Sequence, residues 1–189
     1  MRDKTASSKS TILEAGFDLL SRNPGASLAE IAAHAGVGRA TLHRHFTGRA
    51  DLVAEMALVA SSELNAAVDA AVQDAPTYAE GLRVAFRAML PLAQRYMFLG
   101  TEPVEQDPRV AATYAAETAE LYSDIDAAKA EGAFDTDVPT AWIAQAYENL
   151  LYASWAMVAA EEATPNQAAD LAWRTLTTGL KPTEKHHDT

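Results

Sequence analysis

The sequence predicts an all-α protein with a small helical head at the N-terminus, a long connecting helix and a larger helical body. Apolar residues recur about every 3.6 positions along most of the chain, without the sustained alternation or turn pairs of β-hairpins. Two short helix signals separated by a glycine turn stand near the N-terminus, and longer helix signals follow them. With 49% hydrophobic residues among 189, the chain can bury a substantial core.

We expect two domains that differ in charge. The head spans residues 1–50, including a mobile polar tail over residues 1–9, and the body spans residues 51–182 before a tail at 183–189. The head carries seven Lys and Arg against four Asp and Glu, whereas the rest of the chain carries eight against 22. The net charge of −11 is therefore unevenly spread, and an acidic body would leave the basic end to approach a polyanion. Acidic surfaces also simply aid solubility.

The first helix of the head is predicted over residues 10–22. Ser10 can cap its N-terminus, and apolar side chains follow at helical spacing from Ile12 to Leu20. The run Asn23-Pro24-Gly25 then ends the helix, because it combines three residues that favour turns.

A helix-turn-helix is predicted directly after this turn. Ser27 and Glu30 form a capping box, in which the Ser side chain accepts from the Glu30 N–H and the carboxylate accepts in return. Gly36 can adopt the positive φ that ends a helix, and a second short helix follows over residues 39–45. Two short helices around a tight glycine turn are typical of DNA-binding motifs.

The second of these helices has an outward face suited to the major groove of DNA. Leu42 and Phe46 fall on its inner side, whereas Ala40 and Arg44 lie opposite. Arg side chains read guanine edges, and small methyl-bearing side chains meet thymine methyl groups. Simple solvation of these polar residues is the less favoured alternative. The candidate DNA-contacting residues are Ser27, Gly38, Arg39, Ala40, Thr41, His43, Arg44, His45, Thr47 and Arg49.

A resemblance to a known family covers residues 10–56, about a quarter of the chain. Their sequence, STILEAGFDLLSRNPGASLAEIAAHAGVGRATLHRHFTGRADLVAEM, is similar to the DNA-binding domain of the TetR/AcrR family of transcriptional regulators. The chain departs from the family pattern at Gly38, where Ser is common, at His43, where Tyr is common, and at Arg49, where Lys is common. The resemblance implies that the partner is a double-stranded DNA operator.

A long helix is predicted to connect the head with the body. Thr47 can cap it, and Arg49 stands beside the positive end of its dipole, a combination suited to a DNA phosphate. An apolar stripe runs from Leu52 to Ala71. The predicted helices from here on cover residues 48–73, 77–96 with a bend at Pro91, 108–131 ending at Gly132, 138–162 capped by Asp137, and 165–180 capped by Thr164.

Aromatic and Met side chains are frequent in the body. Pockets between the helices of a bundle are mostly apolar with a few polar groups, and the family resemblance implies that a small-molecule effector binds in this region. Ordinary core packing is the alternative for each single residue, because large aromatic side chains also dominate cores. The candidate effector-binding residues are Phe86, Met89, Tyr96, Phe98, Tyr122, Trp142, Gln145 and Trp155.

The last two predicted helices combine many Ala residues with bulky Leu and Trp residues. Small side chains permit close approach of helices, and the resemblance implies that this helix pair forms a homodimer. A two-fold dimer would also present two recognition helices to a palindromic operator. The candidate dimer residues are Leu150, Ala153, Met157, Leu171, Trp173 and Leu176.

Other classes of function find little support in the sequence. The chain has no cysteine, no glycine-rich phosphate loop, no H-E-x-x-H and no G-x-S-x-G, so we expect no enzyme and no cofactor. We expect no metal site either, because His43 and His45 point partly at DNA and His186-His187 lies in the tail. The N-terminus lacks the apolar core of a signal peptide and no apolar run is long enough for a bilayer, which favours a cytoplasmic protein outside the membrane.

The predicted function is therefore a ligand-responsive transcriptional regulator. Its simplest form is a repressor that a small apolar or aromatic effector releases from a palindromic operator, although the sequence does not separate repression from activation. One alternative is a helical small-molecule binding protein whose DNA-binding head is vestigial, and another is a protein-interaction module. The negative net charge of the whole chain, and Gly38 in place of the common Ser, favour these alternatives. The complete polar outward face of the second short helix argues against them.

Overall fold

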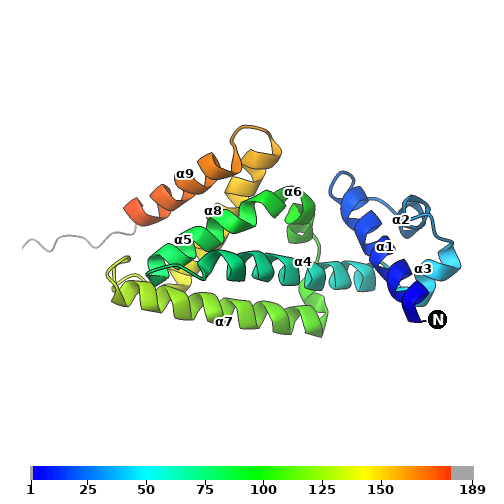
Figure 1. The fold of residues 1–189 in the computed structure, drawn as a ribbon, viewed down its shortest axis with the longest axis horizontal. Helices are drawn as coiled ribbons and strands as arrows, with labels where there is room; N and C mark the ends of the chain where they lie inside the picture. Colours follow the sequence, from blue (N-terminus) through cyan, green and yellow to red (C-terminus); the bar gives the residue numbers. More distant parts are fainter. Residues whose placement is uncertain (1, 180–189) are drawn as a thin grey trace, which may run out of the picture. The chain divides into compact units, whose positions relative to one another are not determined.

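A computed structural model describes the backbone of residues 2–179 and the side chains of residues 8–92 and 95–179. The described chain is all-helical, without strands, which confirms the predicted fold class (Figure 1). Its elements are α1 (Arg2–Leu20), α2 (Leu28–His34), α3 (Arg39–His45), α4 (Arg49–Val72), α5 (Tyr78–Met89), the 3₁₀ helix η1 (Leu90–Leu92), α6 (Ala93–Tyr96), the 3₁₀ helices η2 (Met97–Thr101) and η3 (Val104–Gln106), α7 (Pro108–Ala130), α8 (Thr140–Ala159) and α9 (Pro165–Gly179).

The chain folds into two compact units, each built from two segments. Unit 1 comprises Met1–Glu63 and Gln94–Tyr114, and unit 2 comprises Leu64–Ala93 and Ala115–Thr189. Helices α4 and α7 both run through this division. The units therefore differ from the predicted division after residue 50, because the first half of α4 and a distant segment pack with the head. The functional boundary drawn at residue 50 stays a prediction.

Unit 1 contains the predicted helix-turn-helix. Helices α1, α2 and α3 pack against one another, and their largest apolar side chains, including Phe17, Ile31 and Phe46, are buried. Gly16 of α1 lies close to α4, since a Cβ at this position would sit 3.0 Å from Sδ of Met56. The apolar spacing read from the sequence thus identifies the face that each of these helices buries.

Helix α1 begins earlier than the sequence predicted. It starts at Arg2, so Ser10 lies inside the helix and is not its N-cap, and residues 2–9 are helical rather than a tail. No Gly or Pro interrupts this stretch, and Lys9 forms an ion pair with Glu55 at 2.5 Å. A continuous helix is therefore compatible with the sequence, and it supplies hydrogen-bond partners within the helix for the backbone carbonyl groups of residues 2–9.

The segment Gln94–Tyr114 packs with the head inside unit 1. The rings of Tyr96 and Phe98 lie edge-on to Phe17, with centroid distances of 5.3 and 6.4 Å. Arg95 donates two hydrogen bonds to the carboxylate of Glu14, at 2.7 and 2.9 Å. The segment is thus held to α1 by both apolar and ionic contacts.

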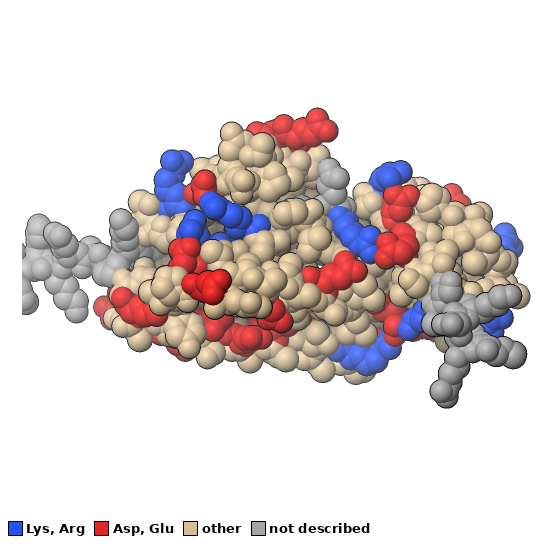
Figure 2. All heavy atoms as spheres, in the orientation of Figure 1, with Lys and Arg blue, Asp and Glu red and all other residues tan. Residues whose placement is uncertain are grey.

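Unit 2 is a helical bundle in which α8 and α9 pack along each other and α5 also contacts α9 (Figure 1). The indole N–H of Trp155 donates to the carbonyl oxygen of Met89 at 3.2 Å, which joins α8 to α5. Arg87 and Asp170 form an ion pair between α5 and α9. On the face drawn in Figure 2, acidic side chains gather along the region that α7 occupies in Figure 1.

The helix ends of unit 2 follow the sequence with one exception. The 3₁₀ turn at Leu90–Leu92 interrupts the predicted helix at Pro91, and Gly132 adopts a φ of +82° just after α7. Thr164 accepts a hydrogen bond from the Gln167 N–H at 3.3 Å and caps α9 as predicted. Asp137 does not cap α8, because Pro139 occupies the N-cap position and the helix begins at Thr140.

The predicted tail at 183–189 and the predicted last helical residue, Leu180, lie outside the described residues. None of the described helices combines the length and the apolar character needed to cross a membrane.

Candidate nucleic-acid interface and ligand region

The core of unit 1 fixes helix α3 in place. Leu42 and Phe46 are 1% and 0% exposed, so the inner face of the helix is locked among apolar side chains. Gly36 adopts a φ of +65°, and the Val37 N–H then donates to the Ala32 carbonyl at 3.0 Å, which closes the turn between α2 and α3. This local geometry is the one that the sequence predicted.

The outer face of α3 is polar and open to solvent. Arg39, Ala40, His43 and Arg44 are exposed, whereas Thr41 is half-buried. These side chains are therefore available to another molecule. His45 is half-buried as well, and its Nε2 atom has no hydrogen-bond partner.

The arginines of unit 1 fall into two groups. Arg22, Arg49, Arg95 and Arg109 each form at least one ion pair with an Asp or Glu of the same unit. Among the described side chains of unit 1, the only arginines without such a partner are Arg39 and Arg44, both on α3. The uncompensated positive charge of this part of unit 1 therefore coincides with the predicted recognition helix.

The N-terminal ends of α2, α3 and α4 are capped in different ways. Ser27 and Glu30 form both hydrogen bonds of the predicted capping box at the start of α2, and the carboxylate contacts lower the pKa of Glu30. Gly38 occupies the N-cap position of α3 and offers no side-chain hydrogen bond, with open space where a Cβ would stand. Thr47 does not cap α4 as predicted: its N–H and hydroxyl both donate to the Asp51 carboxylate, at 2.9 and 3.3 Å.

Arg49 is the predicted DNA contact with the strongest partners inside the chain. Its guanidinium donates to the carbonyl oxygens of Pro24 and Ala26, each at 2.7 Å, and to the carboxylate of Glu102 at 2.5 Å. A phosphate contact from Arg49 would have to replace or share these acceptors. Its role at DNA stays a prediction.

The eight predicted effector residues do not form one cluster. Tyr96 and Phe98 belong to unit 1, where they are buried against Phe17. The hydroxyl of Tyr96 also donates to the carboxylate of Glu63. Their contacts are those of core residues, which was the alternative for each aromatic side chain.

Other predicted effector residues gather inside unit 2. Phe86 of α5 lies edge-on to Tyr147 of α8, with ring centroids 5.2 Å apart, and Trp155 is buried on the same helix. Met89 and Tyr122 are half-buried on α5 and α7. The contacts of Phe86 with Tyr147 and of Trp155 with Met89 are the part of the predicted site that unit 2 brings together.

Asp124 of α7 adds a titratable group that was not among the predicted effector residues. Burial raises the pKa of Asp124, and its charge contributes to the raised pKa of Tyr147, so the two groups interact. No Lys or Arg among the described residues forms an ion pair with Asp124. No sequence motif marks this residue, because its neighbours come from other helices.

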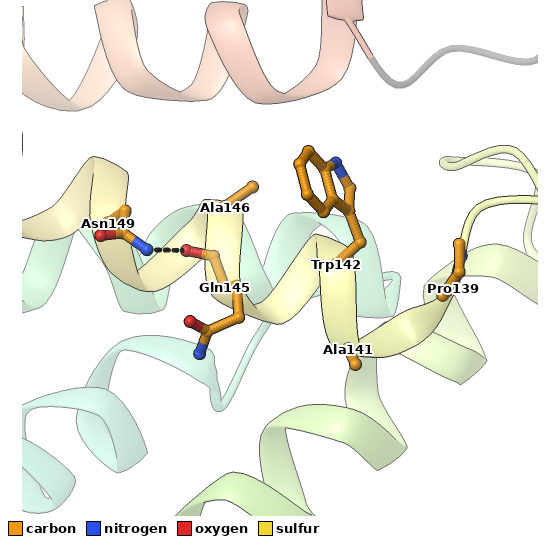
Figure 3. A pocket seen from close by; sticks show the side chains of 6 residues that line it. All are labelled: Pro139, Ala141, Trp142, Gln145, Ala146 and Asn149. Atoms are coloured by element: carbon orange, nitrogen blue, oxygen red, sulfur yellow. Dashed lines mark hydrogen bonds between the residues drawn. The ribbon is translucent and has the colours of Figure 1, made fainter.

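A groove of about 610 Å³ follows one face of α8 (Figure 3). The predicted effector residues Trp142 and Gln145 lie on its wall, and Trp142 is 64% exposed. The full lining is Pro139, Ala141, Trp142, Gln145, Ala146 and Asn149, all from α8 or directly before it. Enclosed ligand sites usually cover most of their ligand, whereas this groove has a wall from only one helix.

The predicted dimer residues differ in their exposure. Ala153 and Leu171 are exposed, and Leu150 and Met157 are half-buried. Leu176 is buried within its own chain and offers no surface to a partner. Trp173 is half-buried and packs edge-on to Phe134, with ring centroids 6.5 Å apart.

A short helix that exposes two arginines without an ion-pair partner among the described side chains, and that follows a capped helix and a glycine turn, defines a helix-turn-helix DNA-binding protein. The family described as "Bacterial regulatory proteins, tetR family" matches residues 12–56. The HTH-type transcriptional repressor LfrR of Mycolicibacterium smegmatis is 30% identical over 171 residues, which cover 89% of this chain and 88% of LfrR. The chain belongs to the tetR family of bacterial transcriptional regulators.

Solved structures agree with this assignment. The crystal structure of LfrR from Mycobacterium smegmatis in complex with proflavine has a TM-score of 0.74 and 26% identity, and the match covers 93% of this chain and 98% of that chain. A tetR-family regulator from Marinobacter aquaeolei VT8, at 20% identity, has the same fold, with a TM-score of 0.76 over 97% of this chain and all of that chain.

The family assignment supports the predicted class of function, a DNA-binding transcriptional regulator. The family regulates transcription by binding DNA, typically in response to a ligand, and it is regulatory rather than enzymatic. The alternative of a vestigial DNA-binding head is not supported.

Proposed function

We propose that this protein is a homodimeric repressor that leaves a palindromic operator when a small aromatic molecule binds in unit 2. The observation that carries the proposal is the location of Arg39 and Arg44, which are exposed on α3 and have no ion-pair partner among the described residues. A cation without an internal partner can contact DNA at little cost in free energy, since no ion pair within the protein must first be broken. The exposed Ala40 between them allows close approach to the base edges.

The exposed face of α8 supports the dimer. Trp142 and Tyr152 are large side chains that are 64% and 48% exposed, and Leu171 of α9 is 41% exposed. Aromatic residues are enriched at protein interfaces, and a second copy of the same face would supply the missing wall of the α8 groove. On this proposal Trp142 and Gln145 are interface residues rather than effector-binding residues.

The aromatic group of unit 2 supports an aromatic effector. Phe86, Tyr147 and Trp155 come from α5 and α8, and the half-buried Asp124 of α7 lies near Tyr147. The structure of LfrR holds proflavine, a planar aromatic amine. We propose an effector of this class, with Asp124 as its polar anchor, because a half-buried carboxylate that forms no ion pair with a described residue favours a positively charged partner.

The mechanism we propose is a shift between two dimer conformations. In one of them the two α3 helices are spaced to enter successive major grooves, roughly 34–36 Å apart. The effector must bind the other conformation more tightly, since equal affinity for both would shift nothing. A cytoplasmic location fits this role, because bacterial DNA lies in the cytoplasm.

Fluorescence anisotropy tests the proposal with the full-length protein and duplex DNA from the region upstream of its own gene. We expect tight binding that weakens with salt, that exceeds binding to scrambled duplex, and that proflavine reduces. An Asp124→Asn variant should bind operator normally but should require more proflavine for release. Failure to select any sequence from a random duplex pool would overturn the repressor assignment. Selective binding that no aromatic amine affects would overturn only the effector class.

A further inference from the structure

Arg49 is held by three acceptors that belong to two distant parts of the sequence. Pro24 and Ala26 contribute carbonyl oxygens from the loop between α1 and α2, and Glu102 contributes its carboxylate from the segment between η2 and η3. All of these residues lie in unit 1. The Arg49 side chain is 34% exposed and that of Glu102 is 17% exposed, so the ion pair stands at the surface and partly shielded from water.

The position of Arg49 in the sequence makes this ion pair relevant to DNA. Arg49 is the first residue of α4 and follows the end of α3 by four residues. A cation at the N-terminus of a helix, beside free N–H groups, is well placed for a phosphate. Arginine recognises carboxylates and phosphates with the same planar fork of donors, so Glu102 occupies Arg49 with an anion of related shape and charge.

We infer that Glu102 is an internal competitor that must release Arg49 before Arg49 can bind an operator phosphate. The inference rests on the proposed function, because it assumes that unit 1 binds an operator. The two carbonyl contacts to the α1–α2 loop can remain in the bound state, since a guanidinium has five N–H donors. Glu102 is the acceptor that competes, because it carries the charge that a phosphate would replace.

The segment that carries Glu102 is connected at both ends to unit 2. The chain passes from Ala93 of unit 2 to Gln94 of unit 1, and from Tyr114 of unit 1 back to Ala115 of unit 2. A rearrangement of unit 2 can therefore act on Glu102 through the chain itself. Glu102 thus gives effector binding a route to the Arg49 contact that does not run along the length of α4.

The test compares operator affinities of full-length variants by fluorescence anisotropy at several salt concentrations. Glu102→Gln and Glu102→Asp both loosen the ion pair, and the second does so without changing the net charge. Each should tighten operator binding by about two- to fivefold, the effect expected for a partly exposed ion pair. Glu105→Gln is the matched control, because Glu105 is exposed on the same segment and forms no described ion pair.

Arg49→Gln identifies the route of the effect. It should weaken operator binding and lower the slope of log affinity against log salt by about 0.9, the value for one phosphate contact. In the Arg49→Gln background, Glu102→Gln should no longer tighten binding, because the group for which it competes is absent. A gain that persists without Arg49, or an equal gain from Glu105→Gln, would overturn the inference and leave net charge as the cause.

The wild-type titration separates this inference from the proposed function. If wild-type protein selects its operator but the Glu102 variants bind with unchanged or lower affinity, only the competition is wrong. If wild-type protein selects no duplex at all, the proposed function fails and the inference fails with it. Amide hydrogen exchange gives an independent readout: operator should speed exchange in η2 and η3 of the wild type and not of Arg49→Gln, because coupling between sites is reciprocal.

Discussion

The phenolic hydroxyl of Tyr147 on α8 donates a hydrogen bond to the carbonyl oxygen of Leu82 on α5, at 2.9 Å. Both residues are buried, and Phe86 lies edge-on to the Tyr147 ring. A polar contact therefore lies beside the packed aromatic rings, where it fixes the register between two helices of unit 2.

Replacing Tyr147 with Phe should lower the free energy of unfolding by about 0.5–1.5 kcal/mol, since the ring packing remains and one buried hydrogen bond is lost. Urea denaturation followed by circular dichroism at fixed protein concentration measures the change. Tyr78→Phe serves as control, because Tyr78 is 53% exposed on α5 and should leave stability unchanged. Equal effects of the two variants would show that the buried hydrogen bond contributes nothing.

Tyr147 should also make stability fall at alkaline pH. Burial and the nearby charge of Asp124 raise the pKa of Tyr147 above its ordinary value of 10.0. In the unfolded chain the phenol of Tyr147 loses its proton from about pH 10, whereas in the folded chain the phenol stays protonated. The contribution of Tyr147 to the free energy of unfolding is therefore complete below about pH 10 and is lost as the pH rises above it. Urea denaturation between about pH 8 and 11 should show that the free energy of unfolding declines less in Tyr147→Phe than in the wild type. Identical declines would contradict the assignment of this pH dependence to Tyr147.

A serine at position 38 should fit the structure and should increase both stability and DNA affinity. The φ and ψ of Gly38 are −72° and 152°, which suit an N-cap, and no atom lies within 4 Å of the position of a Cβ. Gly38→Ser should raise stability by about 0.5 kcal/mol through a new cap and a less flexible unfolded chain, and its hydroxyl should tighten operator binding through a phosphate. Thermal unfolding and anisotropy measure the two effects.

Gly36→Ser is the contrasting variant. Gly36 has a φ of +65°, which a serine adopts only at a cost of about 1 kcal/mol. The two substitutions add the same side chain two residues apart and should change stability in opposite directions. A loss of stability in both variants would mean that Gly38 has a conformational role that its backbone angles do not reveal.

Structural features that depend on residues close together in the sequence could be predicted from the sequence. Ser27 and Glu30 are three residues apart, so their capping box could be recognised, and the inner face of α3 followed from Leu42 and Phe46 by helical spacing alone. The early start of α1 was missed because Ser10 looks like a cap, although no residue before it breaks a helix.

Contacts between distant residues could not be predicted in the same way. Arg49 and Glu102 are separated by 53 positions, and no periodicity relates them. Tyr96 and Trp155 are both buried aromatic residues in the sequence region expected to bind a ligand, but one packs in unit 1 and the other in unit 2. Which aromatic side chains meet depends on the packing of whole helices, which composition does not specify.

Arg44 should contribute to the choice of operator sequence. It is exposed on α3 and has no ion-pair partner among the described residues, so it is free to make a bidentate contact with guanine. Arg44→Ala should weaken operator binding by about 1–3 kcal/mol and relax the preference at one base pair of each half-site. Selection from random duplexes followed by sequencing measures both. Arg174→Ala removes the same charge from an exposed position on α9 and should leave base preference unaltered; a uniform loss over all sequences from Arg44→Ala would make Arg44 a phosphate contact.

Trp142 should hold the dimer together. It is 64% exposed on the groove of α8, and an indole that becomes buried at an interface typically contributes about 2–4 kcal/mol when truncated. Trp142→Ala should therefore raise the dimer dissociation constant by roughly 30- to 1,000-fold, measured by sedimentation velocity over a range of concentrations. Operator affinity at low protein concentration should fall with it, since a monomer presents only one α3 helix.

Tyr78→Ala is the matched control for Trp142→Ala, because it removes another large exposed aromatic side chain from unit 2, and it should leave the dimer intact. The same pair of variants distinguishes the two roles considered for Trp142. If Trp142→Ala leaves the dimer unchanged but abolishes the effect of proflavine on operator binding, Trp142 belongs to the effector site, as its aromatic character in the sequence first indicated. If dimerisation alone is lost, the groove on α8 is completed by a second copy of the chain, and the effector site lies among the buried aromatic residues of α5 and α8.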